Sequence, residues 1–477
     1  MASIDLPEPM EWSSVSRERW AERVAADLGV EDADAALART ASSGVRTRVL
    51  YTESEGGPAL PENLRPRRGW KACETFDVSL ERVSSVVREA VLEGLASVRL
   101  AGDVDALDPE EFTAVLSALG ATKIDRPQIV LRPTGTPGRV LDVVDGVAVE
   151  FFGGFDPVRN VLADGRGRFD GAAVAQEELA LLGHWKASGQ TGRALEVDGS
   201  YLREAGANAV DELAFLLAAA TERLRGAARA GIGARAWLRQ TAVRVGVGRD
   251  LFDEIAKLRA IRLVFAKLCQ SAADGDCGLV APVVHAVGLV RELAPVDRAS
   301  NALRTSSHAF AGAVGGAHTI ELAPFERGSR IGERLARTTH SVLAHEAHLA
   351  RVDDPAGGSW YVEALTDGIA RAAWDRFRAI ERAGGLASWI ESGALASLLE
   401  ERRSALAAAV NAGTHTIVGV TEYPPPPGTE SEGTASRSTA ASPRSSVGAS
   451  GWPLVEGLCE ADLLEPEPAA RTAEARS

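Results

Sequence analysis

The chain has 477 residues, of which 45% are hydrophobic, so it can bury the core of one large domain or of two or three ordinary ones. Its 66 Asp and Glu residues outnumber its 52 Lys and Arg residues, and no dense basic run occurs, which argues against nucleic acid as a partner. The sequence has no signal peptide and no apolar run that could span a membrane, and its four cysteines show no pairing pattern, so we expect a cytoplasmic protein without a membrane partner.

Residues 11–30 have the pattern of an amphipathic helix, with Trp12, Trp20 and Val24 on one face. The simplest interpretation is that this apolar face packs on the core of the same chain.

Short apolar runs alternate with helical patterns from about residue 45 to residue 330. The runs that predict strands are 45–51, 96–102, 128–133, 147–154, 194–199, 242–248, 277–285 and 318–325. Helical patterns lie between most of them, at 80–94, 173–189, 208–230, 249–270 and 297–315. Strands that alternate with helices pair in parallel through βαβ units, and eight of them favour a closed barrel over an open sheet. We therefore predict an α/β fold, a (β/α)8 TIM-type barrel, followed by Ala-rich helices at 362–383 and 388–413.

The composition changes at Tyr423, where PPPPG opens a stretch rich in Ser, Thr, Gly and Ala that continues to about Gly451. Such a stretch buries too little apolar surface to offset the entropy of an ordered chain, so we predict a disordered tail. The final segment after it is long enough for one short helix only. The sequence thus predicts an N-terminal arm over 1–44, a barrel domain with trailing helices over 45–424, and a low-complexity tail over 425–477.

The phrase ALEVDGSYLREAGA, residues 194–207, has the form of a barrel strand that continues into a turn and then into a helix near Asn208. In barrel enzymes the loop after a strand carries the chemistry. Five further phrases stand out at 151–157, 252–262, 301–318, 353–366 and 417–424. Together the six phrases resemble the methylmalonyl-CoA mutase family over roughly residues 10–424, and they are most similar to its small, non-catalytic subunit. The last phrase, IVGVTEYP, resembles the family's closing strand after the barrel domain.

In catalytic members of that family, polar side chains hold the substrate thioester, and here the matching positions carry other residues. By resemblance, an Arg and a Tyr fall at Cys73 and Thr75, a catalytic Gln at Gly154, a Tyr-His pair at Ser200 and Tyr201, and a further Gln at Val296. We interpret these six as a vestigial substrate pocket without catalytic residues. Loss of one preorganised donor costs about 3–4 kcal/mol of transition-state stabilisation, so loss of several together predicts no useful turnover.

The resemblance also implies a cofactor, adenosylcobalamin, which supplies the homolysis of a cobalt–carbon bond in the family's radical rearrangement. Catalytic members hold it in a C-terminal flavodoxin-like domain with a DxHxxG loop. This chain contains no DxHxxG, and the 53 residues after Pro424 (477 − 424) are too few for a domain of about 100 residues. We expect the chain to bind no cofactor and no metal by itself.

The resemblance leads to a first functional hypothesis, a non-catalytic subunit that forms a heterodimer with a catalytic mutase chain. Residues 11–30 would then be an arm that wraps the partner. The alternative is the catalytic barrel of a split acyl-CoA mutase that works with a separate cobalamin-binding chain, and the replaced pocket residues argue against it. A weaker third hypothesis is a barrel that binds an acyl-CoA as a sensor. The chain therefore resembles an isomerase family but is predicted to be inactive alone.

Three other groups of residues have both a chemical and a structural interpretation. His340, His345 and His348 lie close in sequence, but HEAH is one residue short of the HExxH spacing, so we expect structural histidines rather than a metal site. Cys73 follows several basic residues, as a reactive thiol does, but a small buried side chain is favoured. The patch LRPRRGW, 64–70, fits the phosphates of coenzyme A or a solvated or interface-facing surface, and the second interpretation is favoured.

Overall fold

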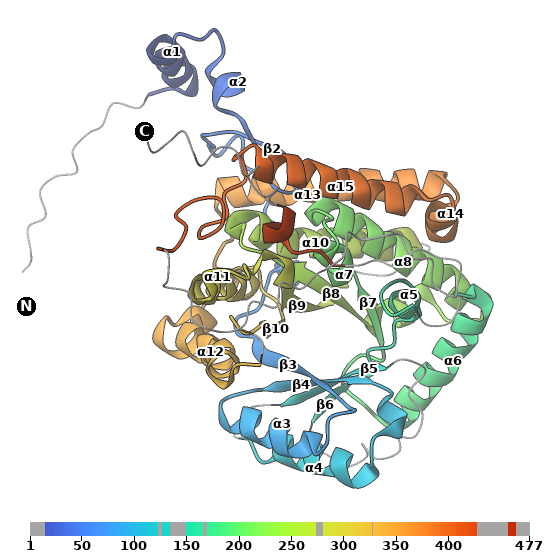
Figure 1. Ribbon diagram of the computed structural model, residues 1–477. Helices are drawn as coiled ribbons and strands as arrows, with labels where there is room; N and C mark the ends of the chain where they lie inside the picture. The colour runs from blue at the N-terminus through green and yellow to red at the C-terminus, as the bar shows by residue number, and fades with distance from the viewer. Residues whose placement is uncertain are drawn as a thin grey trace, which may run out of the picture.

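The computed structural model describes residues 15–122, 126–133, 149–165, 169–272, 280–326, 328–426 and 457–463. The predicted disordered stretch therefore lies almost entirely outside the described residues. Eight parallel strands form the centre of the molecule (Figure 1): β3 Lys71–Asp77, β4 Ser97–Gly102, β5 Gln128–Pro133, β6 Glu150–Phe152, β7 Leu195–Asp198, β8 Thr241–Val247, β9 Val283–Gly288 and β10 Thr319–Glu321.

The sheet closes on itself. The strand order is β6-β5-β4-β3-β10-β9-β8-β7, and a parallel bridge between Phe155 and Leu195 joins the two ends of this order. After β5 the chain leaves the described residues until β6, and each of the other strands is followed by helical structure that packs on the outside. The hydrophobic core lies between the strands and these helices. The predicted (β/α)8 TIM-type barrel is confirmed.

Residues 45–51 are not a barrel strand, so this prediction is wrong. Arg46–Thr47 is strand β2, which pairs antiparallel with β1, Arg39–Thr40, outside the barrel. The first barrel strand is β3, whose polar and apolar residues alternate because Ala72 and Phe76 pack on helices while Cys73 lies on the opposite face. A continuous apolar run, the pattern used to predict the strands, is therefore absent from β3.

The predicted closing strand at 417–424 is also absent. Within these described residues the chain makes a tight turn, closed by a single bridge between Val418 and Glu422, because Gly419 adopts a left-handed φ of +83°. The other seven predicted strand regions each overlap an observed strand.

Helices surround the barrel at α3 Val83–Leu92, α4 Pro109–Gly120, α5 Pro157–Leu162, α6 Gly171–Ala187, α7 Ser200–Glu204, α8 Ala209–Arg229, α9 Ala234–Arg239, α10 Leu251–Ala272, α11 Asn301–Val314 and α12 Arg330–Ser341. Helix α8 shows how local sequence starts an element. Asn208 accepts a hydrogen bond from the Asp211 backbone while the Asp211 carboxylate accepts one from the Asn208 backbone, a reciprocal capping box. Apolar residues on all sides of α8 are buried between the strands and an outer layer of helices.

The outer layer consists of α13 Trp360–Arg382, α14 Gly385–Glu391 and α15 Ala394–Asn411 (Figure 1). The predicted helix at 388–413 is thus divided in two, because Gly393 adopts φ +80° and ends α14.

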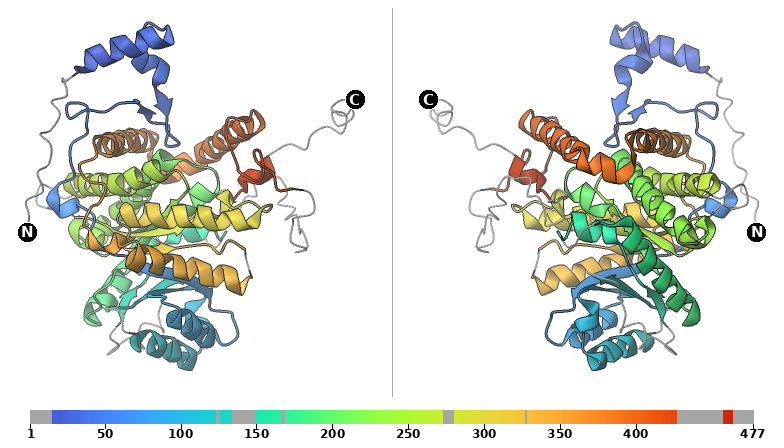
Figure 2. Two further views of the ribbon diagram at one scale, coloured as in Figure 1. Left: turned by 90° about the vertical axis from the view of Figure 1, so that its left-hand side faces the viewer. Right: turned by 90° about the vertical axis from the view of Figure 1, so that its right-hand side faces the viewer.

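The N-terminal arm projects from the barrel (Figure 2). Helix α1, Arg17–Leu28, buries no residue, and an ion pair from Arg17 to Asp34 links it to the short helix α2, Ala33–Leu37. Its Trp20 is stacked by the Arg17 guanidinium at 4.5 Å from the ring centroid. The interpretation of this helix as packed on its own barrel is wrong. Trp12 lies outside the described residues.

The structure also bears on the expectations for membrane spans and for the cysteines. Among the described residues, no helix is both long and apolar enough to cross a membrane. The expectation that the cysteines are unpaired is wrong for Cys269, which is fully buried in α10 and disulfide-bonded.

Candidate functional site

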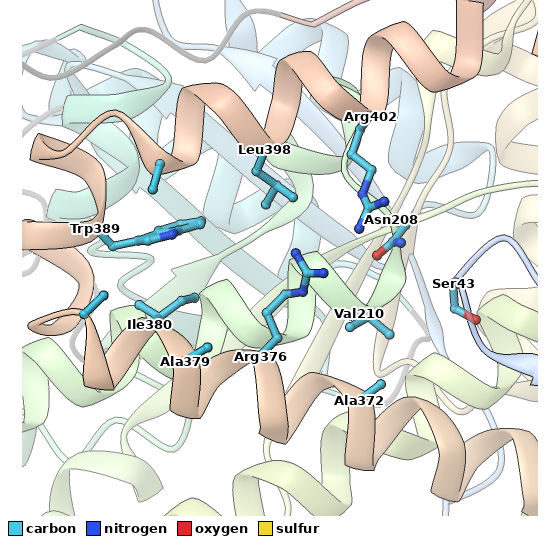
Figure 3. A pocket seen from close by; sticks show the side chains of 13 residues that line it. Ser43, Asn208, Val210, Ala372, Arg376, Ala379, Ile380, Trp389, Leu398 and Arg402 are labelled. Atoms are coloured by element: carbon cyan, nitrogen blue, oxygen red, sulfur yellow. The ribbon is translucent and has the colours of Figure 1, made fainter. Parts of the chain in front are cut away.

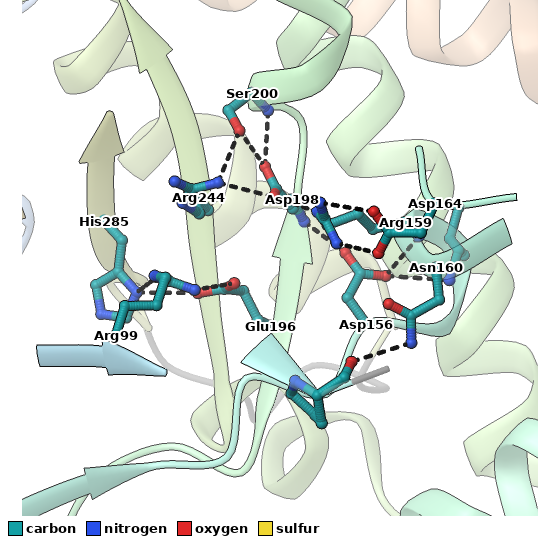
Figure 4. A network of polar contacts seen from close by, with 12 residues as sticks. Arg99, Asp156, Arg159, Asn160, Asp164, Glu196, Asp198, Ser200, Arg244 and His285 are labelled. Carbon is teal, nitrogen blue, oxygen red and sulfur yellow. Dashed lines mark hydrogen bonds and ion pairs between the residues drawn. The ribbon is translucent and has the colours of Figure 1, made fainter. Parts of the chain in front are cut away.

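The barrel interior carries charged side chains from alternate positions of several strands (Figure 4). Side chains of a strand alternate between its two faces, so the residues two apart in LEVD, Glu196 and Asp198, both enter the barrel. They meet Arg99 of β4, Arg244 of β8 and His285 of β9.

The middle of the barrel is closed by Arg99, Glu196 and His285. Arg99 donates two hydrogen bonds to the Glu196 carboxylate, at 2.8 and 3.0 Å, and His285 Nδ1 lies 3.0 Å from the same carboxylate. All three side chains are at most 2% exposed, and the ring of Phe152 packs edge-on against His285 at 5.1 Å between centroids. Bulky, paired side chains therefore fill the barrel axis at this level.

Burial alone would raise the pKa of Glu196, but the Arg99 guanidinium and the hydrogen bond to His285 outweigh it and hold this pKa well below its usual range. Burial lowers the pKa of His285 in spite of the Glu196 carboxylate. The middle layer is therefore an arginine–carboxylate pair with a neutral imidazole at neutral pH.

A second charged layer lies toward the carboxyl ends of the strands. Arg244 Nη2 donates to Glu321 at 2.8 Å, and Arg244 Nη1 lies 3.2 Å from both Asp198 and the Ser200 hydroxyl. The Ser200 hydroxyl in turn donates to Asp198 at 2.6 Å, and Arg159 pairs with Asp198 at 3.2 Å. Burial opposes the Arg244 charge, but Asp198 and Glu321 outweigh it and raise its pKa, so this cation is permanent.

Three of the six predicted pocket residues meet around this network. Ser200 is part of it, and Cys73 lies opposite Glu321 in the β3–β10 register. Thr75 lies two residues further along β3, opposite Arg99. Cys73 is only 5% exposed, and burial, assisted by Glu321, raises the pKa of its thiol to about 12. The thiol is therefore protonated at neutral pH, which removes the basis for the reactive-cysteine interpretation.

The other three do not contribute side chains to the network. Tyr201 packs edge-on against Phe215 in the hydrophobic core, with ring centroids 5.9 Å apart. Val296 is half-buried in the loop after β9. Gly154 has φ +58°, and a Cβ there would lie 1.7 Å from the Leu131 carbonyl oxygen, so the backbone itself requires glycine. No side chain fits at the position matched to the catalytic Gln.

The sequence-based prediction did not include the ionisable residues that dominate the interior, which are Arg99, Glu196, Asp198, Arg244, His285 and Glu321. The sequence did contain a pattern that indicates these residues. Each stands inside an otherwise apolar or small-residue strand, and a charge in a strand buried on both faces needs a partner.

A cavity of about 610 Å³ opens at the amino ends of the strands. Its lining includes Arg67, Arg68, Lys71 and Arg126, and Lys71 pairs with Glu150 at 3.4 Å. Phe152 also lines it, and this ring packs on His285 of the closed layer. The patch at 64–70 thus borders a basic cavity that ends inside the barrel.

The histidines near this cavity show no metal geometry. Trp70 Nε1 donates to His340 Nδ1 at 3.0 Å, and burial lowers the pKa of His340 to about 4, so the imidazole is neutral and accepts. His345 and His348 are exposed. Within the described parts of the chain, no cluster of three or more His, Cys, Asp or Glu side chains could hold a metal ion.

Residues 457–463 cover part of the face where the strands end. They include the short helix η8, Glu460–Leu463, and the Leu458 backbone donates to the Glu204 carbonyl at 2.9 Å. The Glu460 carboxylate is buried, 2.7 Å from Arg249 and 3.0 Å from His415. This segment, residues 457–463, therefore binds at residues 204–207, the EAGA loop.

The contacts of Glu460 with Arg249 and His415 should also limit the access of reagents to the neighbouring Cys459. The Sγ atom of Cys459 lies 3.7 Å from the Leu293 carbonyl. Glu460→Gln removes a charge-assisted contact, so the rate of maleimide labelling at Cys459 should rise about tenfold. Mass spectrometry of the Cys459 peptide measures this rate, and Asp462→Asn, at an exposed position, is the control. Equal rates in both variants would show that Glu460 does not hold the segment.

The family model and the relatives that match this chain all point to one family. A family model described as methylmalonyl-CoA mutase matches residues 167–442. A protein of Mycobacterium tuberculosis named probable methylmalonyl-CoA mutase small subunit is 31% identical over 471 residues, which cover 88% of this chain and 73% of that protein. The methylmalonyl-CoA mutase small subunit of Streptomyces virginiae is 33% identical, covering 83% of this chain and 67% of its own length. The methylmalonyl-CoA mutase of Escherichia coli is 31% identical over 233 residues, which are 48% of this chain and 33% of that protein.

Proposed function

The chain belongs to the methylmalonyl-CoA mutase family, and from that premise we propose that it is a non-catalytic partner of an adenosylcobalamin-dependent mutase. In this proposal a second, catalytic chain interconverts methylmalonyl-CoA and succinyl-CoA. The relatives covered over most of this chain are named small subunits, which supports a heterodimer with that chain.

The observation that carries the proposal is the closed barrel axis. Arg99, Glu196 and His285 fill its middle, and Arg244 with Asp198 and Glu321 fills the layer above. A thioester that entered the basic cavity at the amino ends would have to break the buried Arg99–Glu196 pair to reach the opposite face. Removing one partner of a buried pair costs about 3–5 kcal/mol, so such a passage is strongly disfavoured.

In this proposal the chain itself binds no cobalamin. Two histidines lie near the carboxyl ends of the strands, and each bonds to a carboxylate: His308 Nε2 lies 3.2 Å from Glu292, and His415 Nε2 lies 3.0 Å from Glu460. In both rings the Nε2 atom is therefore taken up by a carboxylate. The cofactor of the proposed complex therefore belongs to the catalytic chain.

The isolated chain is expected to be inactive. Incubated with adenosylcobalamin and methylmalonyl-CoA, it should give no succinyl-CoA above background, and the visible spectrum of the cofactor should not change. A catalytic mutase chain assayed in parallel is the positive control. Turnover by the isolated chain would refute the proposal.

Association with a catalytic chain tests the partner role directly. The two purified chains should elute as a one-to-one complex in size-exclusion chromatography with light scattering. Activity that appears only after addition of a stand-alone cobalamin-binding chain would favour the split acyl-CoA mutase instead. Failure to associate with a mutase chain at any salt concentration would leave the acyl-CoA sensor as the better hypothesis.

A further inference from the structure

An open groove separates two helices of the outer layer, away from the barrel interior (Figure 3). Its volume is about 670 Å³, and it lies between α13 and α15, with α14 at one end. The walls carry small side chains at Ala372, Ala379, Ala383 and Ala394. Because these side chains are short, they leave space between the two helices instead of filling it.

One end of the groove is cationic. Arg376 of α13 and Arg402 of α15 approach from opposite walls and share one buried carboxylate, Asp211, at 2.9 and 2.7 Å. Asp211 also accepts the backbone N–H of Asn208, so its acceptor sites are largely used. Two guanidinium groups thus face one buried carboxylate. A further acidic group, Glu401, lies 3.9 Å from Arg402, but it is exposed to solvent, which weakens its effect. The pair therefore keeps a surplus positive charge inside the groove.

The other end is apolar. Trp389 of α14, Ile380 of α13 and Leu398 of α15 line it, and Trp389 and Leu398 are only half-buried (Figure 3). The groove therefore offers an indole and two aliphatic side chains at one end and a guanidinium pair at the other. Small-molecule sites in proteins have this combination of apolar lining with a few polar groups, at volumes of about 300–1,000 Å³.

We propose that this groove binds a small amphipathic monocarboxylate, with its carboxylate on Arg376 and Arg402 and its apolar body against Trp389, Ile380 and Leu398. A single negative charge matches the surplus charge of the arginine pair, because Asp211 neutralises the other cation. A planar carboxylate also accepts the paired N–H donors of a guanidinium. The site lies outside the barrel and does not depend on the proposed partner role.

Fluorescence titration of the full chain tests the site with two probes, 11-(dansylamino)undecanoate and the corresponding primary amide. The carboxylate should bind saturably to the unmodified chain, and Arg376→Gln should weaken it about tenfold, because one charge-assisted contact is lost. Arg376 is the informative position, since Arg402 still pairs with Asp211 in this variant. The amide should bind the unmodified chain more weakly than the carboxylate and should be insensitive to Arg376→Gln.

Two matched variants define the site. Arg371→Gln removes a charge from the exposed face of the same helix, where Arg371 pairs with Asp367, and it should leave the affinity within about twofold. Ala379→Phe fills the groove while both arginines stay in the sequence, and it should abolish saturable binding of both probes. The proposal is overturned if Arg376→Gln and Arg371→Gln bind the carboxylate equally well, or if the unmodified chain shows no saturable binding.

Discussion

Glu196→Gln is expected to lower the free energy of unfolding by about 3–5 kcal/mol, among the largest effects of any single substitution in this chain. The amide cannot balance the charge of Arg99, whose guanidinium is 1% exposed and donates two hydrogen bonds to the carboxylate. A buried cation without a counter-charge is costly because water cannot reach it. Urea or thermal unfolding, followed by circular dichroism, measures the loss.

The matched control is Glu89→Gln. Glu89 also pairs with an arginine, Arg330, but both side chains are exposed. Exposed ion pairs contribute at most about 1 kcal/mol, so this variant should unfold close to the unmodified chain. Equal effects in both variants would contradict the view that the Arg99–Glu196 pair holds the barrel centre together.

The same pair predicts a pH dependence with a defined sign. The folded-state pKa of Glu196 lies below the unfolded value of about 4.3, so the ionised carboxylate stabilises the fold at every pH above that value. As the pH falls below it toward the folded pKa, the unfolded chain binds the proton more readily and the stabilisation is lost. The unmodified chain should therefore lose stability in this acid range more steeply than Glu196→Gln does.

Deletion of residues 1–30 is expected to weaken the proposed complex with a catalytic mutase chain at least 100-fold, which corresponds to about 2.7 kcal/mol. Helix α1 buries no residue on its own barrel, and its Trp20 is the residue type that dominates interface energetics. For the same reason the deletion should change the unfolding midpoint of the isolated chain little. Biolayer interferometry with an immobilised catalytic chain measures the affinity.

Trp20→Ala separates the anchor from the rest of the arm. It should account for a substantial part of the loss, whereas Trp374→Ala, on the outer helix layer, should leave the affinity unchanged. Trp374 stacks with Lys267 and Phe377 of its own chain, so its substitution tests packing rather than association. If the truncated chain binds as tightly as the full chain, the arm is not the anchor.

Much of the fold followed from local patterns. Alternating strands and helices predicted the barrel because side-chain periodicity and the handedness of βαβ units are local properties of the chain. The same reasoning failed at 45–51 and at β3, because a barrel strand with Cys73 and Thr75 on its inner face is no more apolar than an exposed hairpin.

The family could be recognised from ordered phrases such as the EAGA loop, because each phrase is contiguous in the sequence and can be read without knowing its contacts in the fold. The grouping of the residues in the site could not be predicted in this way. The sequence identified Ser200 and Cys73 as places where catalytic side chains are replaced, but it gave no reason to group them with Arg244 and Glu321. These residues come from β3, β8, β10 and the start of α7, and their pairing depends on the register in which the strands close.

The sequence by itself determined the barrel, the family and the replacement of catalytic side chains, because each depends on residues that are near one another along the chain. Only the tertiary structure decided that charged pairs close the barrel axis, that α1 stands free of the barrel, and that Glu460 binds on the face where the strands end. Arg99 and Glu196 are 97 positions apart, and Arg249 and Glu460 are 211 positions apart. A contact over such a separation depends on how the whole chain closes, and no local pattern encodes it.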